Sequence, residues 1–206
     1  MKINKDILKN TVKAENQVKL NQTFLGDLKN PKAFRIMYIG NSITLHEVKP
    51  DIGWYFNHGM AASKPENDYV HITNGLIEKF LKKPISSLVY NAADFEREYN
   101  VPIMSSKLIE QAKKFKPEII FFRIGENVYK DNLDTSAVKL AFKNLITELS
   151  KICKRIIITS LFWYFEPLDI MLKELADEFK YEYVYIFLDK SKSLLILLLS
   201  IDINLN

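Results

Sequence analysis

Short, almost wholly apolar segments alternate with longer amphipathic segments along this chain, and this alternation constrains the fold more than any other feature. The apolar segments are rich in β-branched and aromatic residues, which predicts buried strands; they cover residues 35–44, 87–90, 118–124, 155–161 and 183–187. The amphipathic segments have helical spacing and cover residues 68–82, 105–115, 134–153 and 167–179. This order predicts an α/β protein: a three-layer α/β/α sandwich around a central, mostly parallel five-stranded sheet.

The chain of 206 residues is long enough for one domain with extensions at both ends. A weak amphipathic pattern, broken by Gly26 and Pro31, predicts an N-terminal arm or helix over residues 1–33. The α/β domain is expected over residues 34–188. Residues 189–206 form a tail of a different, strongly apolar composition.

Composition excludes several classes of protein. The net charge of +4 comes from scattered lysines rather than a cluster, so we expect no nucleic-acid partner. Cys153 is alone, which excludes a disulfide framework, and we expect neither a metal nor a cofactor. No segment has the roughly 18 apolar residues of a membrane span and none resembles a signal peptide, so a cytoplasmic location is expected.

Polar residues follow three of the predicted strands. Ser42, Asn91 and Asn127 each stand where an apolar run stops, and parallel strands bring such ends to one edge of the sheet, where ligands bind. Ser42 is either a nucleophile or the cap of a following helix, and this stretch alone does not decide between them. The apolar loop over residues 45–63 is expected to fold back over the strand ends as a pocket wall.

Three motifs in this order resemble the SGNH (GDSL-type) hydrolase superfamily: Gly40-Asn41-Ser42-Ile43-Thr44, Asn91-Ala92-Ala93-Asp94-Phe95-Glu96 and Gly125-Glu126-Asn127. The stretches Ile52-Gly53-Trp54 and Gly59-Met60-Ala61-Ala62-Ser63 are also similar to a subgroup of bacterial members. The resemblance spans residues 34–188 and implies the flavodoxin-like architecture of that superfamily. It also implies a serine esterase or acylhydrolase.

The resemblance assigns roles to particular residues. Ser42 would attack an ester carbonyl, and its own N–H would be one oxyanion donor. Asn127, after Gly125, would supply a second donor. The third donor of the family is a backbone N–H, here expected from Ala93 or Asp94, although the glycine usual in that segment is missing.

The expected substrate is a small-molecule or glycan ester, either lipid-type or an acetylated carbohydrate. Asn41, Asn91 and Glu126, which lie in the three motifs, are candidate substrate contacts, as are Trp54 and Trp163. Four aromatic side chains either line an acyl pocket, stack on a sugar or simply pack in loops and core: Trp54, Phe56, Phe162 and Trp163. Asp169 and Asp177, in the last helical segment, are expected to be solvated.

The catalytic base is the missing part of this pattern. The family carries Asp-x-x-His near its C-terminus, but the C-terminal part of this chain has no histidine; His46, His58 and His71 all lie earlier. One hypothesis is truncation or a frame shift near residue 188, and the other is a genuine apolar strand or helix that covers the sheet edge. The rival functions are a non-catalytic SGNH-like scaffold that binds a ligand, and a flavodoxin-like cofactor binder that lacks the expected glycines.

Overall fold

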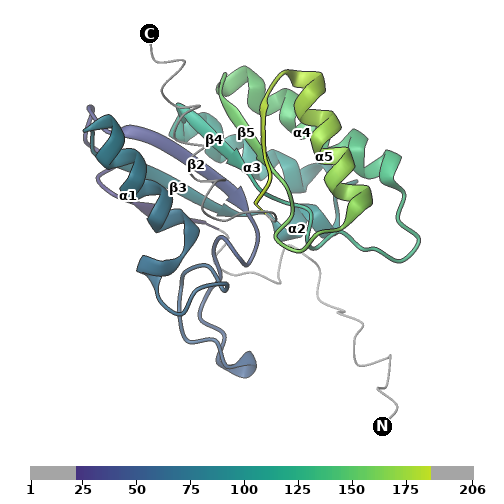
Figure 1. Ribbon diagram of the computed structural model, residues 1–206, viewed down its shortest axis with the longest axis horizontal. Helices are drawn as coiled ribbons and strands as arrows, with labels where there is room; N and C mark the ends of the chain where they lie inside the picture. Colours follow the sequence, from purple (N-terminus) through teal and green to yellow (C-terminus); the bar gives the residue numbers. More distant parts are fainter. Residues whose placement is uncertain (1–21, 187–206) are drawn as a thin grey trace.

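The computed structural model describes residues 22–186, which form a six-stranded sheet flanked by helices (Figure 1). The strand order is β1-β3-β2-β4-β5-β6, and every neighbouring pair is parallel except β1 with β3. The strands are β1 Gln22–Leu25, β2 Phe34–Gly40, β3 Ile85–Asn91, β4 Ile119–Phe122, β5 Ile156–Thr159 and β6 Glu182–Val184. The predicted α/β class and mostly parallel sheet are confirmed, with a sixth strand inside the predicted N-terminal arm.

Helices cover both faces of the sheet, so the three-layer prediction is confirmed (Figure 1). One face packs against three helices and the other against α1. The helices are α1 Tyr69–Leu81, α2 Ala93–Arg97, α3 Pro102–Phe115, α4 Thr135–Ile152 and α5 Glu166–Phe179, with short 3₁₀ helices η3 Pro50–Ile52 and η4 Pro65–Asn67.

Strand β2 shows why the strands are apolar without alternation. Its Met37 and Ile39 belong to the core on the side of α3, α4 and α5, whereas Ile36 and Tyr38 belong to the core beneath α1. All four side chains are fully buried. A strand covered on both faces needs apolar residues at every position, and it delivers whatever follows Gly40 to the carboxyl edge of the sheet.

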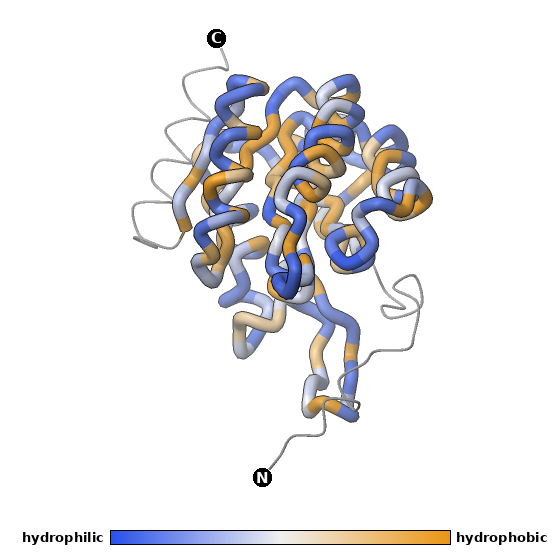
Figure 2. The backbone as a smooth tube through the Cα atoms, turned by 90° about the vertical axis from the view of Figure 1, so that its right-hand side faces the viewer, coloured by the Kyte–Doolittle hydropathy of each residue, from blue (hydrophilic) through white to orange (hydrophobic). Residues whose placement is uncertain are grey.

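The long connection between β2 and α1 folds back only in part. The His46 N–H donates to the carbonyl of His58 (3.1 Å) and the Met60 N–H to that of Ser42 (2.9 Å), so its returning end covers the strand end as predicted. Its tip projects from the body of the domain, with apolar residues in it (Figure 2). There Ile52 and Tyr55 are more than half exposed, so the expectation that the whole loop packs down is wrong.

Asp169 is a second correction. The expectation of a solvated side chain is wrong, because Asp169 is 5% exposed and its carboxylate accepts the N–H groups of Leu161 and Phe165, both at 2.9 Å. Asp177 is exposed and pairs with Lys173. Burial of Asp169 fixes the connection between β5 and α5.

Within residues 22–186, every helix falls short of the length and apolar character that crossing a membrane requires. The apolar tail over residues 189–206, with the truncation hypothesis attached to it, lies outside the described residues.

Candidate active site

Ser42 lies in a tight turn directly after β2. The N–H groups of Thr44 and Leu45 both donate to the carbonyl of Asn41, at 2.9 and 3.0 Å, and close the turn. No α-helix begins until Tyr69, which excludes the helix-cap interpretation of Ser42. Its side chain is half-buried, and within residues 22–186 its hydroxyl has no hydrogen-bond partner.

Gly40 is required by the turn. A Cβ atom at this position would lie 1.7 Å from Oγ1 of Thr44, far inside contact distance. The Thr44 hydroxyl is itself fixed by a 2.8 Å hydrogen bond to the Tyr69 hydroxyl at the start of α1. We call residues 40–45 the serine loop; only glycine lets it close so tightly on the strand end.

Asn41 anchors the serine loop from below. Its side chain is completely buried, and its Nδ2 donates to Glu126 at 2.5 Å and to Glu96 at 3.1 Å. Its Oδ1 accepts the Ile43 N–H at 3.2 Å. All the hydrogen-bonding groups of this amide are therefore engaged within the protein.

Glu96, in α2, joins the three predicted motifs. Its carboxylate accepts from Asn41, from the backbone N–H of Gly125 and from Nδ2 of Asn127, the last at 2.5 Å. Burial, reinforced by the nearby carboxylate of Glu126, raises the pKa of Glu96 to about 7, although the three hydrogen bonds act in the opposite direction. Glu96 therefore takes up a proton near neutral pH.

Glu126 is held by a buried ion pair. Its Oε1 accepts from Nη2 of Arg123 at 2.7 Å and from the Phe162 N–H at 2.9 Å. The Arg123 guanidinium lies 5.6 Å from the ring centre of Tyr69 and 5.9 Å from that of Phe162. Glu126 thus links the serine loop to the connection after β5.

Asn127 is half-buried at the same edge. Its Oδ1 accepts from Nη2 of Arg97 at 3.3 Å, and its Nδ2 already donates one hydrogen to Glu96. An amide nitrogen carries two hydrogens, so one remains for a ligand. Gly125, with φ of +140°, makes the turn that places Asn127 there.

Asn91 closes the third side of the site. It is buried, its Nδ2 donates to the Leu45 carbonyl at 2.7 Å, and its Oδ1 accepts the Ala93 N–H at 2.9 Å. The Ala93 N–H is therefore engaged, whereas Asp94 follows in the first turn of α2, where N–H groups lack intrahelical acceptors. Burial raises the pKa of the Asp94 carboxyl.

The four predicted aromatic residues separate into two groups. Trp54 packs edge-on against Phe56 and His58 in the loop after β2, with ring centres 5.2 and 5.1 Å apart. Trp163 is 60% exposed and packs against Phe162 at 5.0 Å. Of the four, Phe162 lines the pocket beside the serine loop.

None of the three histidines forms a hydrogen bond with the Ser42 hydroxyl. Nδ1 of His46 bonds the Glu47 carbonyl (2.7 Å), and Nδ1 of His58 bonds the Gly59 carbonyl (3.0 Å). His71 pairs with Asp68 at 2.8 Å. Asp68 to His71 has the Asp-x-x-His spacing early in the chain, but Asp68 there caps α1 by accepting the His71 N–H.

Sequence reasoning missed two buried charged residues of this edge, Glu96 and Arg123. A signal was available for Arg123, because a charged residue at the end of the apolar run Ile119-Ile120-Phe121-Phe122 must find a partner. Glu96 gave none, since an acidic residue in a polar segment usually faces solvent. In the part of the chain that the structure describes, no His, Cys, Asp and Glu side chains are grouped for metal binding.

Comparison with known proteins finds solved structures with a similar fold. No family model and no curated protein matches the chain. Among solved structures, Axe2, an acetylxylan esterase from Geobacillus stearothermophilus, is similar with a TM-score of 0.51 at 16% identity, over 74% of this chain and 77% of that chain. LAE5, an alpha/beta hydrolase from the metagenome of Lake Arreo, Spain, gives 0.52 at 16% identity over the same shares.

A variant of Axe2, described as an acetyl-xylooligosaccharide esterase, gives a TM-score of 0.51 at 16% identity, over 75% of this chain and 77% of that chain. Likenesses at this level of identity concern the fold. This chain therefore shares the α/β fold of Axe2 and LAE5.

Proposed function

We propose that this chain is a serine esterase or acylhydrolase that forms an acyl-enzyme at Ser42. The observation that carries the proposal is the anchoring of the segments after β2 and β4, through Asn41, Gly125 and Asn127, on the single carboxylate of Glu96, which itself follows β3. Such an arrangement fixes a serine and amide donors in one place. Fixed donors stabilise the oxyanion that develops in acyl transfer.

In this mechanism the Ser42 hydroxyl attacks the carbonyl carbon of an ester, and the alcohol leaves with a proton. The oxyanion is met by the Ser42 N–H, by the remaining amide hydrogen of Asn127 and by the N–H of Asp94. Asn41, Asn91 and Glu126 hold the loops rather than the substrate, because their side chains are engaged with the protein. Water then hydrolyses the acyl-enzyme.

Without an added general base, the hydrolysis is expected to be slow. A serine hydroxyl needs a base, and losing the histidine of a serine triad costs on the order of 10⁶ in rate. No histidine forms a hydrogen bond with the Ser42 hydroxyl within residues 22–186, and all three histidines of the sequence lie in that range. A small base from solution should therefore replace the missing group.

The test is turnover of p-nitrophenyl acetate with and without imidazole, for the wild type and Ser42→Ala. Imidazole hydrolyses this ester by itself, so the Ser42→Ala protein with the same imidazole is the matched control. We expect an imidazole-dependent excess rate in the wild type that Ser42→Ala lacks. Equal rates in the two proteins would favour the non-catalytic scaffold.

A further inference from the structure

We propose that a basic groove at the edge of the sheet where the parallel strands begin binds an acidic peptide segment of a partner protein, anchored by an apolar side chain of that segment. We call it the lysine groove. The proposal does not rest on the chemistry proposed for Ser42, because Ser42 lies at the opposite edge of the sheet, after the end of β2.

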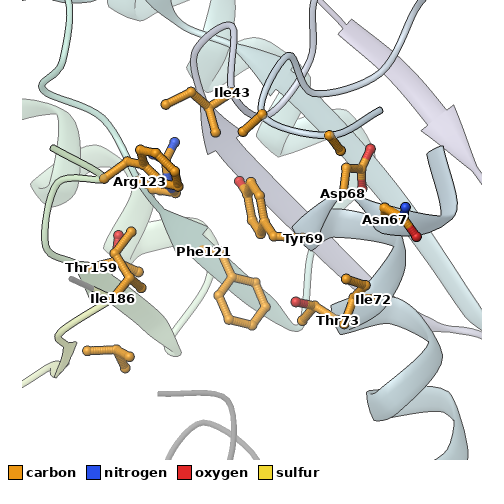
Figure 3. Close-up of a pocket in the computed structure, with 14 residues that line it drawn as sticks. Ile43, Asn67, Asp68, Tyr69, Ile72, Thr73, Phe121, Arg123, Thr159 and Ile186 are labelled. Atoms are coloured by element: carbon orange, nitrogen blue, oxygen red, sulfur yellow. The ribbon is translucent and has the colours of Figure 1, made fainter. Parts of the chain in front are cut away.

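Four parts of the chain form the lysine groove. They are the end of β1 with the loop to the start of β2 (24–35), the end of α1 with the start of β3 (82–86), the end of α3 (111–115) and Glu118 before β4. The pocket beside the serine loop, shown in Figure 3, shares no lining residue with it. The groove has a volume of about 990 Å³, at the upper end of the range for small-molecule sites, which leaves room for several residues of a peptide.

Cationic side chains that are scattered in the sequence meet in this groove. Its only acidic lining residue is Glu118, and its cationic lining residues are Lys29, Lys32, Arg35, Lys82, Lys83 and Lys114. The full chain has 29 lysines and arginines against 25 aspartates and glutamates, so its excess of positive charge is concentrated here. Lys114 pairs with Glu110 at 2.6 Å, whereas the other five cations form no ion pair with residues 22–186.

Helix ends explain part of this charge. Both α1 and α3 end at the groove, and a cation near the carboxyl end of a helix stabilises its dipole, which accounts for Lys82 and Lys114. Lys29, Lys32 and Arg35 lie in a loop and at the start of a strand, where no helix dipole requires a cation. The mutual repulsion of the gathered cations is a cost that an anionic partner would remove.

The loop that carries Lys29 and Lys32 is held in place by hydrogen bonds. The Ser86 hydroxyl donates to the Asp27 carbonyl at 2.7 Å, which ties the loop to β3. The Asp27 carboxylate accepts the Lys29 N–H at 2.9 Å, and Oδ1 of Asn30 accepts the Lys32 N–H at 3.0 Å. A loop that is already ordered loses less conformational entropy when a partner binds.

An apolar surface lies among these charges and favours a peptide over other anions. Phe24 is 43% exposed and packs against Phe115 with ring centres 6.2 Å apart, and Leu28 is 49% exposed. A small inorganic anion would leave this surface uncovered, whereas an apolar side chain between carboxylates would cover it. Single-stranded nucleic acid stacks successive bases on several aromatic side chains, but Phe24 is the only exposed aromatic residue that lines the groove.

Calorimetric titration of the full chain with synthetic octapeptides tests the proposal. The probe has blocked termini and six glutamates, with phenylalanine third and leucine sixth; one control has glutamine for every glutamate, another has serine for both apolar residues, and a third is octathymidylate. We expect one probe to bind per chain, at least tenfold more tightly than the glutamine peptide and at least threefold more tightly than the serine peptide. Raising the salt concentration from about 50 to about 200 mM should weaken the probe.

Three results would overturn the proposal. One is the absence of saturable binding of the probe, including through filling of the groove by residues 1–21 or 187–206. Another is equal affinity for the glutamine or the serine peptide. The third is octathymidylate binding as tightly as the probe, which would indicate a nucleic-acid site instead.

Charge reversal locates the binding. The double variant Lys32→Glu/Lys83→Glu should weaken the probe at least tenfold. The matched control, Lys64→Glu/Lys130→Glu, changes the net charge equally at exposed positions outside the groove and should weaken the probe less than about twofold. Equal weakening by the two double variants would show that only net charge matters and would refute the groove.

The apolar anchor has its own pair of variants. Phe24→Ala should weaken the probe about threefold, whereas Phe56→Ala, 44% exposed in the loop after β2, should leave it unchanged. Thermal unfolding of each variant checks that it is folded. Unchanged affinity in a folded Phe24→Ala protein would refute the apolar anchor and with it the proposed partner.

Discussion

Asn41 shows how a single buried amide can position a surface serine. Ser42 itself makes no side-chain hydrogen bond within residues 22–186, so its place depends on its neighbours. Asn41 supplies two donor hydrogens to Glu96 and Glu126 and one acceptor to the Ile43 N–H. The position of Ser42 is therefore set by the buried residues one layer below it.

Glu96 makes folding stability depend on pH. Its folded pKa of about 7 lies above the ordinary value of 4.5, so the folded state binds the proton more tightly. This contribution is fully present below pH 4.5 and is lost as pH rises through 7; it is on the order of 3 kcal/mol. The wild type should lose free energy of unfolding between pH 5 and pH 8, measured by urea denaturation.

Glu96→Gln removes this titration and should flatten that part of the pH dependence. Glu110→Gln is the control, because Glu110 is an exposed carboxylate on α3 and its loss should leave the wild-type slope. A Glu96→Gln protein with the same slope as wild type would show that Glu96 does not hold a proton at neutral pH.

At the level of residues, the sequence predicted positions better than contacts. Ser42, Asn91 and Asn127 do lie at neighbouring strand ends, because parallel strands necessarily bring their carboxyl ends together. The partners of these residues could not be predicted. Glu96 reaches across from a different segment, and a sequence pattern does not show which carboxylates are buried.

At the level of elements, Asp169 determines how α5 begins. Its carboxylate accepts two backbone N–H groups of the preceding connection, which otherwise would be buried without acceptors. Asp169→Asn leaves one of them facing an amide donor, so we expect a loss of about 1–3 kcal/mol in the free energy of unfolding, measured in urea.

Asp177→Asn, about two helical turns later on the same helix and exposed, is the matched control. Its surface pair with Lys173 should contribute less than about 0.5 kcal/mol. Equal losses in the two variants would contradict the structural role of Asp169.

The elements themselves were predictable where burial follows the periodicity. In α4, Val138, Leu145 and Leu149 are buried at helical spacing, whereas Leu140 is 59% exposed and Phe142 lies in the core. Strand β1 was missed because its four residues lie in a polar stretch and pair only with the edge of β3. Helix α2 was missed because a five-residue helix with three charged residues has no apolar stripe.

At the level of the whole molecule, the two faces of the sheet differ. Helices α3, α4 and α5 cover one face, whereas α1 lies on the other (Figure 1). On the α1 side, a pocket lined by residues of β4, β5 and β6 and by Arg123 remains beside α1. The fold is that of Axe2 and LAE5, but in this chain every histidine is bonded elsewhere than to Ser42. Sharing this fold therefore does not by itself provide Ser42 with a histidine partner.

The most direct test of the central proposal is covalent labelling of Ser42. The full chain is incubated with an alkyl fluorophosphonate and imidazole, and the adduct is located by peptide mass spectrometry. We predict one adduct per chain on Ser42, formed faster with imidazole and absent from Ser42→Ala. No adduct, or an adduct on another residue that persists in Ser42→Ala, would contradict the proposal that Ser42 is the nucleophile.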